Sequence, residues 1–428
     1  MRHRFSDIPA FQRNPLEFIL SKTESSTSQL VPLNIGLQPH YLVNDISLAK
    51  QILKWPEEEI GKGRLVRKLR PITGNSSLVL NGPEHKRRRN LIHHQLARGT
   101  ADAFVPQMCG VIRSFAVNAI KGGTIDVSKV VGPLALRMIS VALFGHEALS
   151  KGDDQAIVSA VHTIEQDVAN SMFRVLPPLP WKKRQEQERR DAAKFTMRAI
   201  VERTSEKLME DSTQTALKRL DLNAEDLADE LLTLLLAGHH TTASAAAWLI
   251  YHMAKDHSLA EALRCEAIEI SDHSGEIDPK KLPQAKLSMS VVQEILRLYP
   301  PSWWFSREAH QDLILADTII RSGTSFIISP WTFHRSQKHW DSPELFNINR
   351  QRSSAAFIPF GSGPRACVGM GIALMELQLL ALELASMCDL EVRQSGNLKP
   401  VASLTLLPPE MAINFSIKTM KIARESAA

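Results

Sequence analysis

Residues 360 to 369 read FGSGPRACVG, a glycine-rich stretch that holds one cysteine, Cys367. Phe360, Gly363, Cys367 and Gly369 fall in the spacing F-x-x-G-x-x-x-C-x-G. Residues 370–384 predict a helix, so Cys367 would precede a helix N-terminus, where free N–H groups and the helix dipole stabilise a thiolate. The glycines would leave space for a flat macrocycle against the sulfur, and Phe360 would limit water there. The stretch therefore favours a metal-ligating thiolate over a free cysteine on a turn.

A second segment, residues 223–254, contains no proline and predicts a helix of roughly 30 residues with Asn223 as its N-cap. Residues 231–252 carry no formal charge over a length that could span a bilayer. The middle of this stretch reads GHHTT, residues 238–242, and these polar groups are costly in lipid. We therefore expect a buried core helix that crosses the whole domain.

The rest of the chain predicts a mainly α protein with a minor β part. Residues 32–45 suit two short strands before a helix that starts near Ile46. Helical periodicity dominates residues 83–270, interrupted by a proline cluster at residues 177–180. After residue 307 short β-type runs appear. Without repeats or Gly/Ser linkers, residues 1–428 predict a single large α+β domain in which small sheets accompany a long central helix.

Composition and charge exclude several classes of function. The net charge is +5, but 51 basic residues are interleaved with 46 acidic ones, so we expect no nucleic-acid partner. Four cysteines without a C-x-x-C pair argue against a disulfide framework or structural zinc and favour a reducing cytoplasm. They are Cys109, Cys265, Cys367 and Cys388. The first 20 residues break every apolar run with charge or proline, so we expect a cytoplasmic protein without a signal peptide or membrane anchor.

The cysteine stretch, including Arg365, resembles the haem-binding signature of the cytochromes P-450. The resemblance runs from about residue 32 to the C-terminus and leaves residues 1–31 as an N-terminal segment. It implies the cytochrome P-450 fold and haem b (iron protoporphyrin IX), with Cys367 as the iron ligand and Phe360, Gly363 and Gly369 in the cofactor-binding loop. In this family the cysteine's electron donation helps to cleave the O–O bond of oxygen.

The same resemblance assigns cationic residues to the haem propionates. His85 and Arg89 in GPEHKRRRN are four residues apart on one predicted helix face, so both could reach one anionic group. Arg307 in FSREA and Arg365 would complete the set. Other residues of the basic run would form a solvated face that could dock an acidic ferredoxin or flavodoxin.

Glu294 and Arg297 in QEILRLYPP stand at positions i and i+3 of a predicted helix, where a carboxylate and a guanidinium can pair. Taken alone, this would be an exposed salt bridge. The pair is similar to the structural E-x-x-R pair of the family, which is linked to a further arginine before the haem loop. Arg350 is the matching residue, so all three would be structural.

Residues 237–242, AGHHTT, resemble the oxygen-activating segment A-G-x-[D/E]-T-T of the family. The resemblance implies that Gly238 leaves room for oxygen and that the Thr241 hydroxyl contacts it and helps to deliver protons. Where the family has Asp or Glu, this chain has His240. Histidine can relay protons because its ordinary pKa lies near 6.5, but the ring could equally pack or bond within the helix. A zinc site from His239 and His240 is not expected, since adjacent helical positions point in different directions.

The family's substrate-facing segments correspond here to residues 302–306 and to the loop around residues 78–80. The candidate pocket residues are Leu80, Ala237, Trp303, Trp304 and Phe305. Any one aromatic ring could also serve packing alone. A proline-rich loop at residues 175–181 resembles the family's mobile lid. The pocket should be apolar and should bind a hydrophobic small molecule such as a terpenoid, fatty acid or polyketide.

These features together imply a monooxygenase that inserts one oxygen atom from O2 into a C–H or C=C bond and reduces the other to water. We expect a ferredoxin or flavodoxin with its reductase to supply the electrons. His240 keeps a second hypothesis open: a haem-thiolate enzyme of atypical chemistry, such as peroxide-driven oxidation, desaturation, ring formation or isomerisation. A third is a non-catalytic haem sensor or carrier.

Overall fold

The computed structural model describes residues 5–97, 102–145, 151–173, 178–204, 212–350, 355–393 and 398–418. Helices form most of this part of the chain, and four small sheets complete it. The fold class predicted from the sequence, mainly α with minor β, is confirmed. That the chain forms a single domain stays a prediction.

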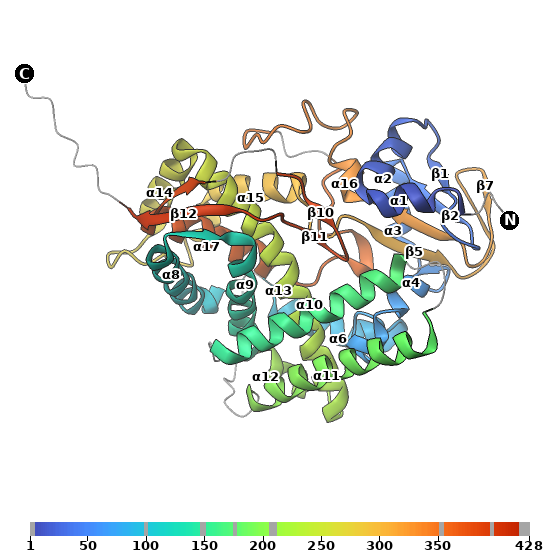
Figure 1. Cartoon of the computed structure of the whole chain (residues 1–428), viewed down its shortest axis with the longest axis horizontal. Coiled ribbons are helices and arrows are strands. Elements are labelled where there is room, and N and C mark those ends of the chain that lie inside the picture. The colour runs from blue at the N-terminus through green and yellow to red at the C-terminus, as the bar shows by residue number, and fades with distance from the viewer. Residues whose placement is uncertain are drawn as a thin grey trace, which may run out of the picture.

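The long helix α13 (Ala224–Lys255) runs through the middle of the molecule (Figure 1). Asn223 caps it as predicted, because its side chain accepts a hydrogen bond from the backbone N–H of Asp226. Helix α13 makes its most extensive contacts with α9 (Val127–Phe144) and α17 (Met370–Met387). Nearly the whole second half of α13 is buried, so the uncharged stretch is a core helix.

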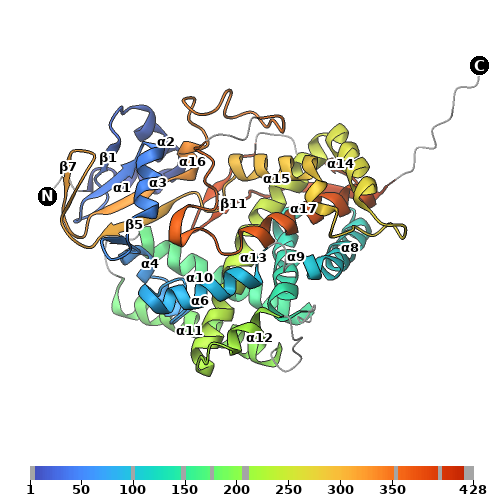
Figure 2. The ribbon, with the colours of Figure 1, turned by 180° about the vertical axis from the view of Figure 1, so that it is seen from behind.

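Further helices surround α13 on both sides of the molecule (Figure 2). The longer ones are α2 (Pro15–Glu24), α3 (Ile46–Lys54), α6 (Gly82–Gln95), α8 (Val105–Gly122), α10 (Lys151–Phe173), α11 (Pro180–Thr204), α14 (His257–Ile270) and α15 (Lys286–Leu298). The short ones are α1 (Ile8–Arg13), α4 (Arg64–Arg67), α5 (Arg70–Thr73), α12 (Thr213–Lys218) and α16 (Pro330–Phe333). Single 3-10 turns lie at Asp102–Phe104, Leu282–Gln284 and Gly363–Arg365. Residues 175–177 of the expected lid loop (residues 175–181) lie outside the described residues.

The largest sheet has the strand order β1-β2-β8-β5-β3. Its strands are β1 (Leu30–Leu33), β2 (His40–Val43), β3 (Ile60–Gly61), β5 (Phe305–Ala309) and β8 (Ser325–Ile328). β1 pairs antiparallel with β2 in a register that places Leu30 opposite Val43, and β2 runs parallel to β8. The two strands predicted before Ile46 are therefore confirmed. β5 and the residues preceding it bring the chain back to the cavity described below.

Three smaller sheets lie elsewhere. One has the order β4-β12-β9, with β4 (Thr124–Asp126), β9 (Cys388–Val392) and β12 (Ala412–Ile417). The other two are hairpins, β6 (Leu313–Leu315) with β7 (Thr318–Ile320) and β10 (Val401–Ala402) with β11 (Leu406–Leu407). The β6–β7 turn places Ala316 and Asp317 at positive φ, as the two central residues of a tight hairpin turn require.

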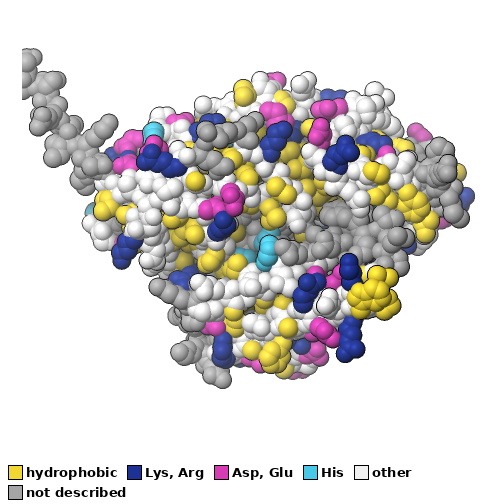
Figure 3. All heavy atoms as spheres, viewed as in Figure 1, with side chains coloured by type: hydrophobic (Ala, Val, Ile, Leu, Met, Phe, Trp, Pro, Cys, Tyr) yellow, Lys and Arg dark blue, Asp and Glu magenta, His cyan; other side chains and the backbone are white. Residues whose placement is uncertain are grey.

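Within the described part of the chain, three helical segments are long and apolar enough to cross a membrane: Asp102–Gly122, Val127–Phe144 and Met370–Met387. In the fold, however, α8, α9 and α17 pack against one another or against α13 and bury their apolar side chains there. Core packing therefore accounts for their apolar character. On the face shown in Figure 3, basic and acidic side chains are interspersed rather than gathered into one basic field.

Candidate active site

The cysteine loop leads directly into helix α17. Gly369 is the N-cap of this helix, which begins at Met370, so Cys367 lies just before the helix as predicted. The backbone N–H of Cys367 donates to the carbonyl of Phe360 at 2.8 Å and closes the loop. Burial raises the pKa of the Cys367 thiol, whereas the N–H of Gly369 and the Arg89 guanidinium lower it. A backbone N–H from the loop and a guanidinium from α6 are thus the groups placed to stabilise a thiolate.

The backbone explains why residue 363 is a glycine. Gly361 and Gly363 have φ values of 70° and 74°, which residues with a side chain rarely adopt. A Cβ on Gly363 would lie 2.4 Å from the carbonyl oxygen of Leu53, at the end of α3. Gly363 is thus required by the backbone turn and by the approach of α3, and its predicted part in the cofactor-binding loop stays a prediction.

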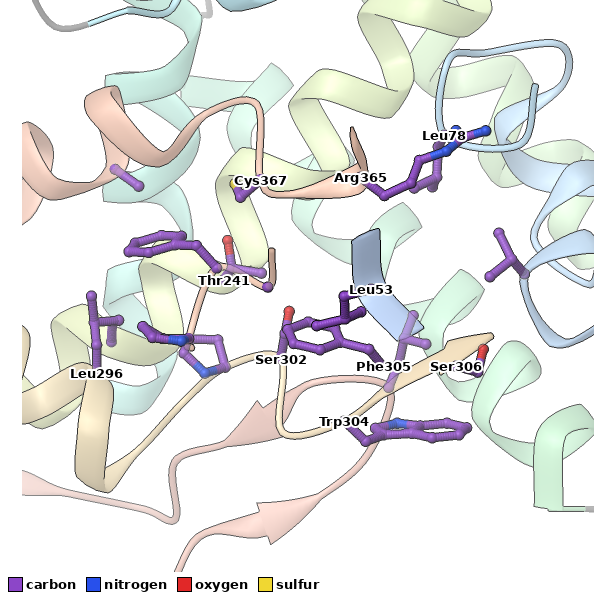
Figure 4. Close-up of a pocket in the computed structure, with 18 of the residues that line it drawn as sticks. Leu53, Leu78, Thr241, Leu296, Ser302, Trp304, Phe305, Ser306, Arg365 and Cys367 are labelled. Carbon is purple, nitrogen blue, oxygen red and sulfur yellow. The ribbon is translucent and has the colours of Figure 1, made fainter. Parts of the chain in front are cut away.

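A cavity of about 350 Å³ lies between the cysteine loop and α13 (Figure 4). Cys367 and Phe360 line it from the loop, and Thr241 and Thr242 line it from α13. Most of the remaining wall is apolar and comes from distant segments: Leu53, Val66, Leu69, Leu78, Leu296, Pro301, Trp304, Leu377 and Leu404. The sulfur and a threonine hydroxyl therefore share one mainly apolar cavity.

Cations gather on the side of the cavity where Arg365 lies. Lys62, Arg307 and Arg365 line it, and Lys62 Nζ donates to the carbonyl of Leu78 at 2.6 Å. Burial, together with the nearby Arg365, lowers the pKa of Arg307 to about 10, although Glu57 opposes this effect. Burial also lowers the pKa of Lys62 well below its usual value, and Arg365 and Arg307 act in the same direction. This cluster would be stabilised by a bound anion.

Glu57 is the carboxylate that these cations share. Arg365 Nη2 donates to Glu57 Oε2 at 2.8 Å and also to the carbonyl of Leu80 at 2.6 Å. His85 Nδ1 is buried, lies 4.0 Å from Glu57 and has no hydrogen-bond partner within the described part of the chain. Burial, reinforced by Arg365, lowers the pKa of His85 to about 4, so its ring is neutral at pH 7. Arg89 donates to the carbonyl of Ala366 at 2.6 Å, next to Cys367.

These residues fit the haem that the motif implies. The cysteine thiol supplies a soft iron ligand, and the cavity beside it is mainly apolar. The cation cluster around Lys62 would neutralise the two carboxylates of a haem, and the unpaired Nδ1 of His85 could donate a hydrogen bond to one of them.

Thr241 reaches the cavity from α13, and its hydroxyl donates to the carbonyl of Ala237 at 2.7 Å. Gly238 serves another purpose than the one predicted. A Cβ on Gly238 would lie 2.6 Å from Cγ1 of Ile139 on α9. The glycine therefore allows α9 and α13 to pack closely, and its missing side chain faces α9 instead of leaving room for oxygen in the cavity.

The family model described as Cytochrome P450 matches residues 6–415. The chain belongs to the cytochrome P450 family. The match includes α1 and α2, which precede the region where the resemblance was noted. Membership implies a haem cofactor and supports assignment as a cytochrome P450 monooxygenase.

The relatives of this cytochrome P450 include bacterial and plant proteins. Pentalenene oxygenase of Streptomyces avermitilis is 26% identical over 415 residues, 93% of this chain and 91% of the relative. Cyclooctat-9-en-7-ol 5-monooxygenase of Streptomyces melanosporofaciens is 26% identical over 420 residues, 93% of this chain and 88% of the relative. Protein LUTEIN DEFICIENT 5, chloroplastic, of Arabidopsis thaliana is 28% identical over 387 residues, 80% of this chain and 64% of the relative's length.

The two adjacent histidines of the P450 segment have different surroundings. His239 is buried beside Gly132, and burial lowers the pKa of its ring to about 3. His240 Nδ1 lies 2.7 Å from the hydroxyl oxygen of Thr405. His240 does not line the cavity that Thr241 faces. The predicted proton relay through His240 stays a prediction.

The structure divides the predicted pocket residues into two groups. Trp304 and Phe305 line the P450 cavity. Leu80, Ala237 and Trp303 do not line it. Trp303 is 1% exposed and donates from Nε1 to the carbonyl of Ser403 at 3.0 Å, so its ring is buried away from the cavity. In the loop around Leu80, the residue that lines the cavity is Leu78. Leu80 instead accepts a hydrogen bond from Arg365 at its backbone carbonyl, and the carbonyl of Ala237 accepts one from the Thr241 hydroxyl.

The predicted E-x-x-R pair is buried as an ion pair. Arg297 donates to both oxygens of Glu294 at 2.8 Å, and Arg350 Nε donates to Glu294 Oε1 at 2.9 Å. Arg297 also donates to the carbonyls of His334 and Pro343. This geometry matches the structural role expected for the three residues in a P450 fold.

Lys62 and Glu376 were not identified from the sequence. Glu376 on α17 is 1% exposed, accepts from the hydroxyl of Thr242 at 3.2 Å and keeps Oε1 without a partner among the described residues. Burial raises the pKa of Glu376 to about 8, although the Thr242 hydroxyl opposes the shift. A glutamate inside the apolar run GIALMELQLL was a signal that could have marked it. Lys62, between two glycines, carried no comparable signal.

Proposed function

We propose that this chain is a haem-thiolate monooxygenase that inserts one oxygen atom from O2 into a hydrophobic small molecule, with iron protoporphyrin IX as its cofactor. The observation that carries the proposal is the mainly apolar cavity shared by Cys367 and Thr241, bordered by cations that match the propionates. Two relatives of similar length have names that denote oxidation of pentalenene and of a cyclooctatenol. A terpenoid substrate is therefore the best supported of the apolar classes.

When bound, the haem supplies the activation of O2. The N–H of Gly369 and the guanidinium of Arg89 would stabilise the Cys367 sulfur as a thiolate, and Phe360, which lines the same cavity, would limit the access of water to it. Arg307, Arg365 and Lys62 would hold the propionates, with His85 donating from Nδ1 to one of them. His85 is suited to this because its neutral ring adds a hydrogen bond without adding charge.

On the side of α13, Thr241 holds a proton at Oγ1 within the cavity. In the structure this proton is donated to the carbonyl of Ala237, so the oxygen can accept a hydrogen bond from a polar group in the cavity. If the hydroxyl rotated away from that carbonyl, it would donate to oxygen or to the substrate instead. The leucines and Trp304 orient an apolar substrate by excluding water from it. Polar contacts at Ser302 and Ser306 would orient any hydroxyl it carries.

Electrons would come from a separate ferredoxin or flavodoxin with its reductase, in a cytoplasmic setting. Lys86 on α6 is exposed and suits an acidic partner. Arg87 is exposed as well, but its guanidinium already donates to Glu84 and to the carbonyl of Leu220. Arg88 of the same basic run is buried and bound to Glu84, Asp226 and Glu230, so it belongs to the fold rather than to a docking face.

The test begins with the spectrum of the reduced, carbon monoxide-bound protein. A long-wavelength Soret band is expected, and it should disappear in Cys367→His although haem remains bound. Turnover of sesquiterpene hydrocarbons under ¹⁸O2 should then give products that carry one ¹⁸O atom. A folded, haem-loaded protein without the band would refute thiolate ligation. Label from water or peroxide instead of O2 would favour the peroxide-driven alternative.

A further inference from the structure

The turn of the β10–β11 hairpin forms part of the cavity wall. Leu404, in the turn that joins the two strands, lines the cavity together with Pro301 and Ser302. Each strand contributes only two residues to the pairing. A two-stranded ribbon of this size is not stable alone, so contacts from outside fix its position and with it Leu404.

Two of these contacts come from the segment before β5. The N–H of Leu406 donates to the carbonyl of Pro301 at 2.9 Å, and Trp303 Nε1 donates to the carbonyl of Ser403 at 3.0 Å. They hold the backbone on both sides of Leu404. They therefore tie the hairpin turn to another stretch of the cavity wall.

The other contacts come from α13. The Ser244 hydroxyl donates to the carbonyl of Leu406, and His240 Nδ1 lies 2.7 Å from Thr405 Oγ1. His240 and Ser244 are four residues apart and therefore share one helix face. Thr405 is only 8% exposed, so water competes little for its hydroxyl. Because a hydroxyl can donate or accept, this bond can form with either tautomer of the ring.

We propose that His240 is a positioning residue for the substrate. Through Thr405 it anchors the hairpin turn to α13, so that Leu404 keeps one wall of the cavity in place beside Thr241. The inference rests on the proposed function, since it requires a haem and an apolar ligand in this cavity. It differs from the relay hypothesis because Thr405, which has no acidic group, is essential to it.

The experiment uses haem-loaded protein and two probes that bind haem iron through the same ring nitrogen, imidazole and N-octylimidazole. Only the longer probe extends along the cavity wall. The variants are His240→Ala, Thr405→Val, their combination and His240→Asn, whose amide retains a hydrogen-bonding atom near Nδ1. His239→Asn controls for a change in the neighbouring histidine. Affinities come from the Soret shift, and thermal midpoints are measured in parallel.

Losing one buried hydrogen bond should weaken N-octylimidazole binding about fivefold in either single variant. The double variant should be no weaker than the singles, because both remove the same bond. Imidazole affinity should change less than about twofold, and His240→Asn should restore most of the octyl affinity. The His239 control should leave the ratio of the two affinities unchanged.

The proposal would be overturned if Thr405→Val bound N-octylimidazole as tightly as the wild type. It would also be overturned if the double variant lost as much binding free energy as the two single variants lose together. An equal loss of imidazole binding would also overturn it, because it would locate the defect at the haem. If the wild-type protein failed to bind imidazole at all, the haem site itself, and with it the proposed function, would be wrong.

Discussion

Replacing Glu376 by glutamine should change how the stability of this protein depends on pH. The carboxyl is 1% exposed, and burial raises its pKa to about 8 from the ordinary 4.5. Between these two values the unfolded chain has lost a proton that the folded chain still holds. The free energy of unfolding contributed by this group therefore falls as pH rises, by about 1.4 kcal/mol per pH unit.

At pH 5 the cost of keeping Glu376 protonated in the fold is roughly 1 kcal/mol, and at pH 7 it is about 3 kcal/mol. Glutamine has no such cost, although its amide leaves a buried donor without a partner, which lowers stability equally at every pH. The free energy of unfolding of Glu376→Gln, relative to that of the wild type, should therefore rise by about 2.5 kcal/mol from pH 5 to pH 7.

Urea unfolding of the haem-loaded protein at half-unit pH intervals, followed by tryptophan fluorescence, measures this difference. Glu269→Gln, at an exposed position on α14, controls for the loss of one carboxylate. Parallel pH curves for the wild type and Glu376→Gln would refute the reasoning, because they would show that Glu376 ionises alike in the folded and unfolded chains.

Three further changes test other parts of the structure. Lys62→Met should stabilise the haem-free protein by relieving repulsion, yet weaken haem binding about tenfold, seen as faster haem transfer to apomyoglobin; an unchanged transfer rate would contradict the cation cluster. Gly238→Ala should lower the unfolding free energy by about 1–3 kcal/mol through its clash with Ile139, and adding Ile139→Ala should recover part of that loss in urea unfolding. Glu294→Ala should cost about 3–5 kcal/mol, because it leaves Arg297 buried without its carboxylate; a thermal midpoint equal to the wild type would contradict this.

Local features were predictable from the sequence. The Asn223 cap, the start of α17 behind Cys367 and the strands before Ile46 each depend on neighbouring residues, and the structure confirms them. The E-x-x-R contact was also predictable, because helix geometry fixes the distance between positions i and i+3.

Side-chain direction was less predictable. Trp303 and Trp304 are adjacent aromatic residues, but only Trp304 lines the cavity. Packing against Ser403, far along the chain, decides which one. Likewise, position 238 must be a glycine because a side chain there would clash with Ile139 on α9. Partners separated by a hundred residues leave no periodic pattern in the sequence.

The ion pair between Glu57 and Arg365 joins residues 308 positions apart. A ribosome that adds about 5–20 residues per second needs roughly 15–60 s to make the intervening chain. During that interval Lys62 and Glu57 are already synthesised, but the cysteine that gives the cofactor its place is not. Haem capture through the thiolate must therefore wait until Cys367 has been synthesised, and a nascent chain that stalls before Cys367 leaves apolar pocket walls for chaperones to cover.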